Sequence, residues 1–183
     1  MFGVPNSINF ETKRLMVRDI EMSDKEEIYA LYSDPNVMQF DNSSGFQSLE
    51  ETEQFIAQIQ NPYVDDGSIR WAIVQKQTGD LIGTCGFRNW DRHSQHAEIG
   101  GNISSKYWRK GYATELLPKL IEYGFNHLQL NKIHAYTLTK NKAVLRLLKN
   151  YNFKKEGILR QYYRLDQGYE DVVIFGKLKS DEW

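Results

Sequence analysis

The feature that most constrains the fold is a pair of apolar segments separated by a short turn. Ile69–Gln75 (IRWAIVQ) and Leu81–Phe87 (LIGTCGF) flank the turn residues Thr78-Gly79-Asp80. Two apolar runs of this length on either side of a glycine-containing turn predict a β-hairpin. The chain is therefore expected to contain an antiparallel sheet, and its other elements have to be arranged around that sheet.

Further segments with the alternating or apolar pattern of strands are spread along the whole chain. They are Arg14–Ile20, Ala97–Ile103, Lys132–Leu138, Phe153–Leu159 and Asp171–Leu178. Ser23 and Ser48 are each followed by a Glu three residues later, a capping-box pattern that predicts the start of a helix. No repeat or low-complexity linker separates these segments. We therefore expect one mixed α/β domain over residues 1–183, with mainly antiparallel strands.

Apolar residues at helical spacing follow Gly111. They are Ala113, Leu116, Leu117, Leu120, Ile121 and Gly124. Pro118 falls inside this predicted helix, where it removes a backbone hydrogen bond and crowds the carbonyl four residues earlier, so we expect a kink beside Thr114. A second helix is predicted after Asn141, because asparagine is a favoured N-cap residue.

The composition is that of an ordinary globular domain. Of the 183 residues, 40% are hydrophobic and 13% aromatic, which is enough for a packed core. The N-terminus lacks the pattern of a signal peptide and the chain has no long apolar run, so we expect a cytoplasmic protein. Cys85 is the only cysteine, and the four histidines show no metal-ligand spacing, so we expect neither a disulfide nor a metal site.

Charge is distributed unevenly along the chain. Residues 1–70 contain 13 Asp and Glu against 5 Lys and Arg, whereas residues 71–183 contain 11 against 18. The first part would attract a cation and the second a polyanion. Solvated helix faces that happen to differ in sign are the alternative explanation.

A basic turn lies directly before the predicted helix. The segment Ser105–Glu115 (SKYWRKGYATE) places three cationic side chains at the positive end of the helix dipole, where they are unfavourable. Gly111 and Ala113 would let a ligand approach the backbone N–H groups, and Arg109 and Lys110 would add charge, which together favour a phosphate cradle. The P-loop and the G-x-G-x-x-G fingerprint are both absent. A solvated basic loop is the alternative.

The run from Glu98 to Glu115, EIGGNISSKYWRKGYATE, resembles the acetyl-CoA-binding motif of the GNAT acetyltransferases, whose core is Arg/Gln-x-x-Gly-x-Gly/Ala. Within that family the chain is most similar to the RimJ/RimL type of ribosomal-protein N-terminal acetyltransferases. ETKRLMVRDI resembles their opening strand, and NKIHAYTLTKNKAVLRLLKNYNFKKEGILRQYYRLDQGYEDVVIFGKL resembles their closing half. The resemblance covers nearly the whole chain. It implies the GNAT fold, a twisted, mostly antiparallel sheet that is splayed near its middle, with helices on both faces.

The resemblance also implies acetyl-CoA as the cofactor. The pyrophosphate of coenzyme A would lie on the backbone at the start of the helix, and the pantetheine arm would pair with the strand before it. The implied residues are Ile99, Gly101, Ile103, Trp108, Arg109, Lys110, Gly111, Tyr112, Ala113 and Thr114, together with Asn141. Trp108 departs from the family, since it occupies the Arg/Gln position of the core motif. The N-cap role is an equally good reason for Asn141.

The catalytic groups of the family are matched less well. Many GNAT enzymes have a tyrosine as general acid where this chain has Leu148, and RimL-like members have a serine where it has Val144. Tyr151 and Tyr136 are nearby in sequence, and the spacing of Tyr151 favours core packing. Glu98, at the start of the pantetheine strand, is the best candidate for the general base. An ordinary carboxylate at a strand end is the alternative reading.

The expected activity is transfer of acetyl from acetyl-CoA to a primary amine. The preferred acceptor is the α-amine of a protein or peptide N-terminus, since about a tenth of such an amine is neutral at pH 7 and needs only a modest base. A polyamine, an aminoglycoside or a metabolite is the alternative acceptor, and a non-catalytic acyl-CoA-binding module is the alternative of another class. We expect no nucleic-acid or membrane partner, and a homodimer is a candidate assembly. Candidates for lining an acceptor site are Tyr32, Met38, Phe40, Trp71 and Trp90, and core packing is the alternative for the strand tryptophan, Trp71.

Overall fold

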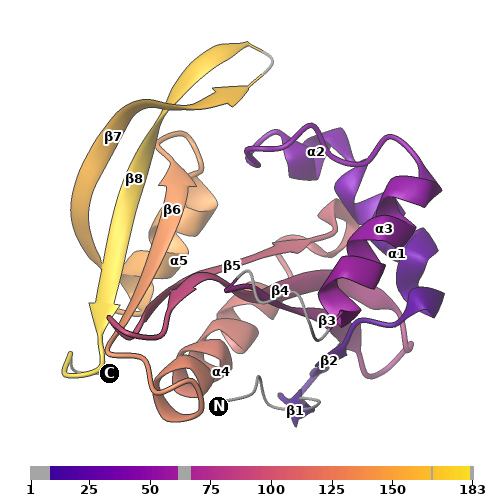
Figure 1. The fold of residues 1–183 in the computed structure, drawn as a ribbon, viewed down its shortest axis with the longest axis horizontal. Helices are drawn as coiled ribbons and strands as arrows, with labels where there is room; N and C mark the ends of the chain where they lie inside the picture. The colour runs from indigo at the N-terminus through magenta and orange to yellow at the C-terminus, as the bar shows by residue number, and fades with distance from the viewer. Residues whose placement is uncertain (1–8, 62–66, 166, 182–183) are drawn as a thin grey trace.

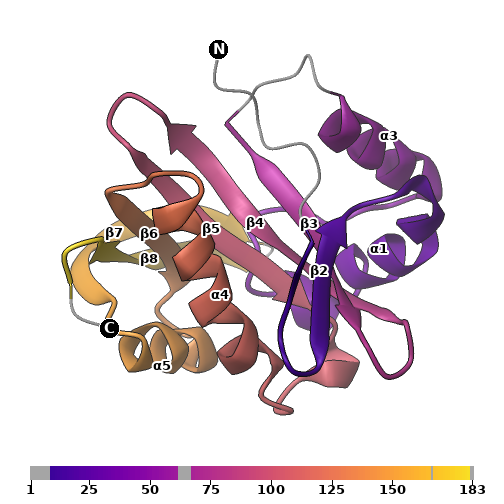
Figure 2. The same ribbon diagram turned by 90° about the horizontal axis from the view of Figure 1, so that it is seen from below.

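The computed structural model describes residues 9–61, 67–165 and 167–181. Their strands form a sheet in the order β1-β2-β3-β4-β5-β6-β8-β7, with helices on both faces (Figures 1 and 2). The strands are β1 (Phe10–Glu11), β2 (Leu15–Asp19), β3 (Ile69–Gln75), β4 (Leu81–Asp91), β5 (His96–Ile103), β6 (Lys132–Leu138), β7 (Lys154–Leu165) and β8 (Gly168–Leu178). The helices are α1 (Lys25–Tyr32), α2 (Pro35–Met38), α3 (Leu49–Gln60), α4 (Tyr112–Asn126) and α5 (Lys142–Asn150). No helix in the described ranges has the length and apolarity needed to cross a membrane.

The side chains of β3 show why the sheet is covered on both faces. Trp71 and Ile73 belong to the core that includes α4, whereas Ala72 and Val74 belong to the core that includes α1 and α3. Successive side chains of a strand point to opposite faces, so a strand buried on both sides has a continuous apolar run. IRWAIVQ has that pattern. The mixed α/β fold predicted from the sequence is confirmed.

The predicted hairpin is confirmed, with β3 and β4 paired antiparallel from Ile69↔Phe87 to Val74↔Leu81. The helix start at Ser48 is also confirmed, because its side chain accepts a hydrogen bond from the N–H of Glu51 at 3.2 Å. The start at Ser23 is wrong. A 3₁₀ turn from Met22 to Asp24 precedes α1, and its capping box is formed by Glu21 and Asp24 instead.

The sheet divides between β5 and β6. Their parallel ladder contains only three pairs, His96↔Lys132 to Glu98↔His134, and it is the only parallel pairing among the described strands. Beyond Glu98, β5 stays paired with β4 as far as Ile103, and β6 stays paired with β8 as far as Leu138. Figure 1 shows β5 and β6 diverging. The splay expected near the middle of the sheet therefore starts immediately after Glu98.

Helix α4 runs through Pro118 as one helix, from Tyr112 to Asn126. Proline has no N–H, so the carbonyl of Thr114 loses its helical donor as predicted. The hydroxyl of Tyr151, at the end of α5, replaces that donor and bonds the Thr114 carbonyl at 2.7 Å. The backbone defect of one helix is thus repaired by a side chain of another.

This repair predicts that two tyrosine-to-phenylalanine changes will have different effects on stability. Y151F removes the donor to Thr114, and we expect the free energy of unfolding to fall by about 0.5–1 kcal/mol, since water can reach this carbonyl. Tyr123 is the matched control, because its buried hydroxyl has no hydrogen-bond partner among the described residues. Y123F should be neutral or stabilising. Denaturant unfolding of both variants tests the pair, and a Y151F protein as stable as Y123F would contradict the assignment.

Candidate functional site

The start of α4 presents free backbone donors. Gly111 is its N-cap residue with φ of 79°, in the left-handed region that glycine adopts without strain, and no described side chain caps the helix there. Arg109 also has a positive φ of 60°. The first N–H groups of a helix have no acceptor within the helix itself. The turn predicted as a phosphate cradle therefore has the backbone geometry of an anion site.

The side chains of the turn are arranged around these donors. Arg109 and Lys110 are exposed, and the Lys110 ammonium lies 5.1 Å from the centre of the Tyr107 ring. The indole N–H of Trp108 donates to the carbonyl of Ile103 at 2.7 Å, which ties the turn to the end of β5. Trp108 thus makes a structural contact at the position where the family motif has Arg or Gln, and the positive charge of the turn comes from Lys106, Arg109 and Lys110.

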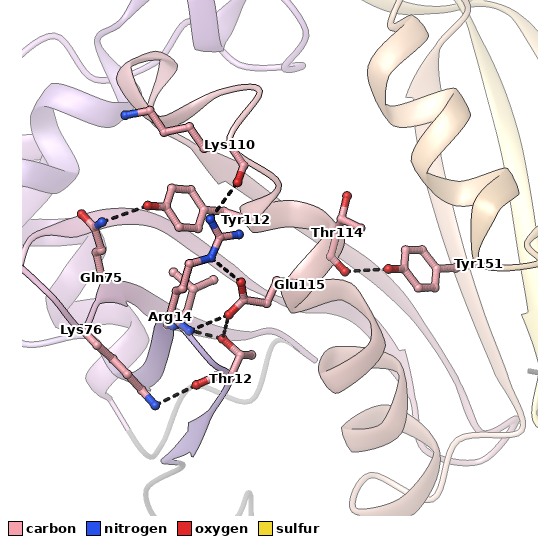
Figure 3. Close-up of polar contacts among 10 residues, drawn as sticks. Thr12, Arg14, Gln75, Lys76, Lys110, Tyr112, Thr114, Glu115 and Tyr151 are labelled. Carbon is pink, nitrogen blue, oxygen red and sulfur yellow. Dashed lines mark hydrogen bonds and ion pairs between the residues drawn. The ribbon is translucent and has the colours of Figure 1, made fainter.

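A cluster of polar contacts fixes α4 to the turn between β1 and β2 (Figure 3). The carboxylate of Glu115 accepts hydrogen bonds from the Thr12 hydroxyl at 2.5 Å, the Arg14 backbone N–H at 2.7 Å and the Arg14 Nε at 2.6 Å. Arg14 also donates to the carbonyl of Lys110 at 2.9 Å, and its guanidinium lies over the ring of Tyr112. This set of contacts, which we call the Glu115 clasp, holds the basic turn and the first turn of α4 in place.

A depression of about 440 Å³ lies beside the clasp, lined by Lys13, Arg14, Gln75, Lys76, Gln77 and Tyr112. Figure 3 shows Gln75 and Arg14 on one side of the start of α4 and Tyr151 on the other. The lining contains three cationic residues, and two of them already form ion pairs, Arg14 with Glu115 and Lys76 with Glu11. The depression is therefore on the β2–β3 side of the cradle, away from α5.

The open edge of β5 offers a second set of backbone groups. The carbonyl of Asn102 lies against Gly83 of β4, and backbone groups alternate in direction along a strand, so those of Gly101 and Ile103 point to the side that β6 has left. The Ile103 carbonyl is the one that Trp108 uses. A side chain on Gly101 would collide with the backbone of β4, whereas one on Gly100 would meet open space. The close approach of the β4 backbone is thus sufficient reason for a glycine at position 101.

Glu98 occupies the point where the strands divide. It is buried, with 3% of its surface exposed, and Arg88 faces it directly across the β4–β5 ladder. Nη2 of Arg88 lies 2.5 Å from one carboxylate oxygen, and Nδ2 of Asn89 donates to the other at 3.1 Å. A shift of register at this point of β4, with φ of 52° at Asn89, turns the Asn89 amide toward Glu98. Glu98 is therefore a buried, paired carboxylate and not a surface one.

Arg88 stays charged in this position. Burial lowers its pKa, but the hydrogen bond and the charge of Glu98 outweigh that effect and hold the pKa above its ordinary value. The Arg88 side chain is 44% exposed, so part of it remains open to solvent, and it hydrogen-bonds the side chain of Tyr163 as well as Glu98. Tyr163 of β7 lies on the same face, and burial raises the pKa of its hydroxyl while Arg88 opposes the rise. Sequence reasoning missed Arg88, Asn89 and Tyr163. The polar end of an otherwise apolar strand, Arg88-Asn89, was the available signal.

Other predicted residues have mixed outcomes. Asn141 caps α5, with its side-chain oxygen accepting from the N–H of Val144 at 3.3 Å. Leu148 is buried and Val144 packs against the same core, so neither position offers a proton donor. Tyr151 packs on that core as predicted, and its hydroxyl has the additional role at Thr114.

The aromatic candidates for an acceptor site are divided among three clusters. Trp71, 2% exposed, lies in the core beside α4, so of its two interpretations core packing is confirmed. Tyr32 and Met38 pack with α1 and α3. Phe40 packs against the cluster of Leu138, Tyr163 and Val172, and Tyr163 lies close to Glu98 and Arg88. Trp90 stacks with the Arg92 guanidinium at 4.4 Å. Of the five candidates, Phe40 is thus in the best position to approach the β5–β6 split.

Comparison with known proteins assigns the family. The sequence matches the Acetyltransferase (GNAT) domain over residues 14–154. It is 38% identical over 175 residues to the uncharacterized N-acetyltransferase YoaA of Bacillus subtilis (strain 168), covering 94% of this chain and 97% of YoaA. The structure of ribosomal-protein-S5-alanine acetyltransferase from Vibrio fischeri matches with a TM-score of 0.85 and 22% identity, covering 95% of this chain and 98% of that one. Spermidine N-acetyltransferase from Vibrio cholerae, solved with CoA and spermine, matches with a TM-score of 0.83 and 24% identity, covering 91% and 96%. This chain therefore belongs to the GNAT family and is an acetyl-CoA-dependent N-acetyltransferase.

The Glu115 clasp predicts a specific dependence of stability on pH. Burial raises the pKa of Glu115, but the hydrogen bonds from Thr12 and Arg14 outweigh it and lower the pKa from 4.5 to about 2. The ionised carboxylate therefore stabilises the fold above pH 4.5, and this contribution is lost as the pH falls from 4.5 toward 2. E115Q should lower the free energy of unfolding by about 1–2 kcal/mol at pH 7. This is less than the shift in the pKa of Glu115 implies, because Arg14 is partly exposed and water screens its charge.

Denaturant unfolding at pH 7 and at pH 3 measures this effect, with E122Q as the control. Glu122 is an exposed residue of the same helix that pairs only with its neighbour Lys119 among the described residues. The stability difference between E115Q and the wild type should shrink at pH 3. A difference that is the same at both pH values would exclude the carboxylate charge as the source of the stability.

Proposed function

We propose that this enzyme acetylates an amine held at the split between β5 and β6, and that its preferred acceptor is the α-amine of a protein or peptide N-terminus. The proposal includes the RimJ/RimL-like branch of the family, a single domain over the whole chain and a cytoplasmic location. The observation that carries the acceptor preference is the half-exposed guanidinium of Arg88 next to buried Glu98.

The cofactor site follows from the two sets of free backbone groups. The donors at Arg109, Lys110, Gly111, Tyr112, Ala113 and Thr114 suit a pyrophosphate, and the flanking cations strengthen such contacts. The open edge at Ile99, Gly101 and Ile103 suits an amide-containing chain, which can pair with a strand as another strand would. Asn141 lies at the start of α5 and remains a candidate for contact with the same arm. Acetyl-CoA supplies the thioester, and the protein supplies its position.

Glu98 is the proposed general base. An amine attacks the thioester only in its neutral form, so the ammonium that predominates at pH 7 must first lose a proton. A carboxylate at the point of divergence is close to where the open edge of β5 begins. Arg88 and Asn89 fix the two oxygens of this carboxylate and keep it in one orientation. Glu98 therefore acts directly on the amine or through a water molecule.

Arg88 favours a peptide over a polyamine. A polyamine carries several positive charges and would meet the guanidinium beside Glu98, which is unfavourable in a partly buried site. A peptide N-terminus carries one charge on its α-amine, and the peptide's backbone carbonyls can accept hydrogen bonds from guanidinium N–H groups that Glu98 does not engage. Asp41, on the same side of the sheet, is already engaged by Asn102 at 3.1 Å. The acidic N-terminal part of the chain nevertheless keeps a polyamine as the second candidate.

The first prediction of this assignment concerns the cradle. Replacing Arg109 and Lys110 together by Ala should weaken coenzyme A binding while affecting dephosphorylated pantetheine derivatives little, because the removed charges face the pyrophosphate. Calorimetry with both ligands measures the difference. The control is a double change at exposed Lys119 and Lys149, away from the turn. Equal losses for the two ligands would exclude the cradle.

The second prediction combines Glu98 with an acceptor screen. Peptides with varied first residues, polyamines and aminoglycosides are compared in the wild type and in E98Q, which preserves shape and removes basicity. We expect peptides to have the highest kcat/KM, and E98Q to lower kcat about 10- to 1000-fold with acetyl-CoA affinity nearly unchanged. The residual activity should rise with pH as more acceptor arrives neutral.

Three results would count against these assignments. Higher kcat/KM for polyamines would replace the proposed acceptor. Wild-type kcat in E98Q across about pH 6–9 would remove the role of Glu98 as base. Tight binding of acetyl-CoA without turnover of any amine would favour the non-catalytic module.

A further inference from the structure

Acetylation of an ammonium releases one proton to the solvent. The acceptor nitrogen begins with three protons and forms a bond to the acetyl carbon as the carbon–sulfur bond breaks. One proton stays on the amide, one ends on the thiol sulfur, and the third must leave the protein. Since an α-amine is mostly protonated at pH 7, this third proton appears in most turnovers. Glu98 is 3% exposed, so a proton that it accepts needs a route outward.

His134 is a titratable group that lies beside Glu98 in the sheet. It is the Cα partner of Glu98 in the short parallel ladder. Ile133 and Ala135 of the same strand pack in the core beside α4, so the side chain of His134 points to the opposite face, where Glu98 lies. His134 is itself buried, with 9% of its surface exposed. The two groups therefore lie side by side on one face of the sheet.

His96 continues this line toward the surface. It precedes Glu98 by two residues on β5 and therefore shares its face, and its ring lies 5.3 Å from that of His134 in an edge-to-face arrangement. The Nδ1 atom of His96 is buried and has no hydrogen-bond partner among the described residues. The Nε2 atom faces the Asp91 carboxylate at 3.8 Å, and both of these side chains are partly exposed. One nitrogen of His96 is thus enclosed in protein, and the other faces a surface carboxylate.

Stability of the fold does not explain why the Nδ1 atom of His96 is buried without a partner among the described residues. A buried polar atom without a partner destabilises the fold, and an apolar side chain of similar shape would avoid that penalty. Metal binding does not explain it either, because no group of three His, Cys, Asp or Glu residues in the described ranges is arranged to hold an ion.

The charges around His134 suit a group that accepts and passes on protons. It faces Glu98 and His96 of β5, Lys132 and Tyr136 of its own strand, and Glu156 of β7. Burial lowers the pKa of His134, while the charge of Glu98 opposes the decrease. The imidazole is therefore neutral at pH 7 and available to take a proton.

We propose that His134 and His96 form a proton exit route from the acceptor amine at Glu98 to Asp91 at the surface. Transfer between the rings occurs directly or through a bridging water. The inference rests on the proposed function, in that Glu98 receives the proton of the acceptor. It assigns His134 and His96 as proton-transfer residues that act through Glu98 without touching either substrate.

The test uses H96A, with H93A as the matched control, because His93 is an exposed histidine of the same β4–β5 turn. At pH 6.5–7 and low buffer concentration, we expect H96A to lower kcat by about 5- to 50-fold with little change in the KM for acetyl-CoA. Added imidazole should restore the rate in proportion to its concentration, since a small base can replace the missing surface relay. H93A should behave as wild type. The deficit should vanish near pH 9–10, where the acceptor arrives neutral and no proton has to be exported.

Two outcomes would overturn the proposal. One is wild-type kcat in H96A at pH 6.5–7 in dilute buffer. The other is a loss that imidazole does not restore and that persists at high pH, which would show a structural role. H134Q supplies a second measurement, with a larger deficit expected, and H96A decides the matter if H134Q does not fold. The assay can use any amine that the acceptor screen identifies, because every ammonium acceptor releases the same proton. Failure of the peptide assignment and failure of the exit route are therefore distinguishable.

Discussion

The short parallel ladder between β5 and β6 is the constraint on which the rest of the structure depends. Three residue pairs join two otherwise antiparallel halves of the sheet, and the pairing ends at Glu98. A longer ladder would pair the backbone groups of Gly101 and the N–H of Ile103, which point to the open edge, with β6. A shorter one would separate Glu98 from His134. The same three pairs thus hold the sheet together, expose an edge for a cofactor and place a buried carboxylate beside a buried imidazole.

The Glu115 clasp performs the corresponding task for the helix. Cations before a helix start are unfavourable by about 0.3–1 kcal/mol each, so the basic turn needs other interactions to keep its position. Glu115 supplies them by placing a negative charge in the first turn of α4 and binding Thr12 and Arg14 of the neighbouring strand region. Arg14 in turn holds the carbonyl of Lys110. The Glu115 clasp therefore holds the start of α4 on the side that faces away from α5. On the side that faces α5, the contact is the hydrogen bond from Tyr151 to the carbonyl of Thr114.

Local patterns predicted the elements, and tertiary contacts account for what they missed. The hairpin, the strand at Ala97–Ile103 and the caps at Ser48 and Asn141 follow from periodicity and turn chemistry within a few residues. The start at Ser23 failed because Arg18 holds both oxygens of Asp24 at 2.8 and 2.7 Å, which fixes Asp24 in the capping box with Glu21. Glu98 was found from the resemblance to a family, but its partners depend on the register of two strands and on the irregularity at Asn89. Neither can be read from a single sequence. The Tyr151 contact with Thr114 likewise joins helices that are far apart along the chain.

Arg88 has a role in folding that is separable from its proposed role in acceptor choice. A carboxylate that is 3% exposed is costly to bury alone, and removing the partner of a buried ion pair costs about 3–5 kcal/mol because an uncompensated charge is left behind. The pair is asymmetric, since Glu98 is enclosed while Arg88 is 44% exposed. Loss of Glu98 leaves a guanidinium that water can solvate, whereas loss of Arg88 leaves a carboxylate that water cannot readily reach. A substitution of Glu98 should therefore change the reaction rate with little loss of stability, whereas a substitution of Arg88 should change both the reaction rate and the stability of the fold.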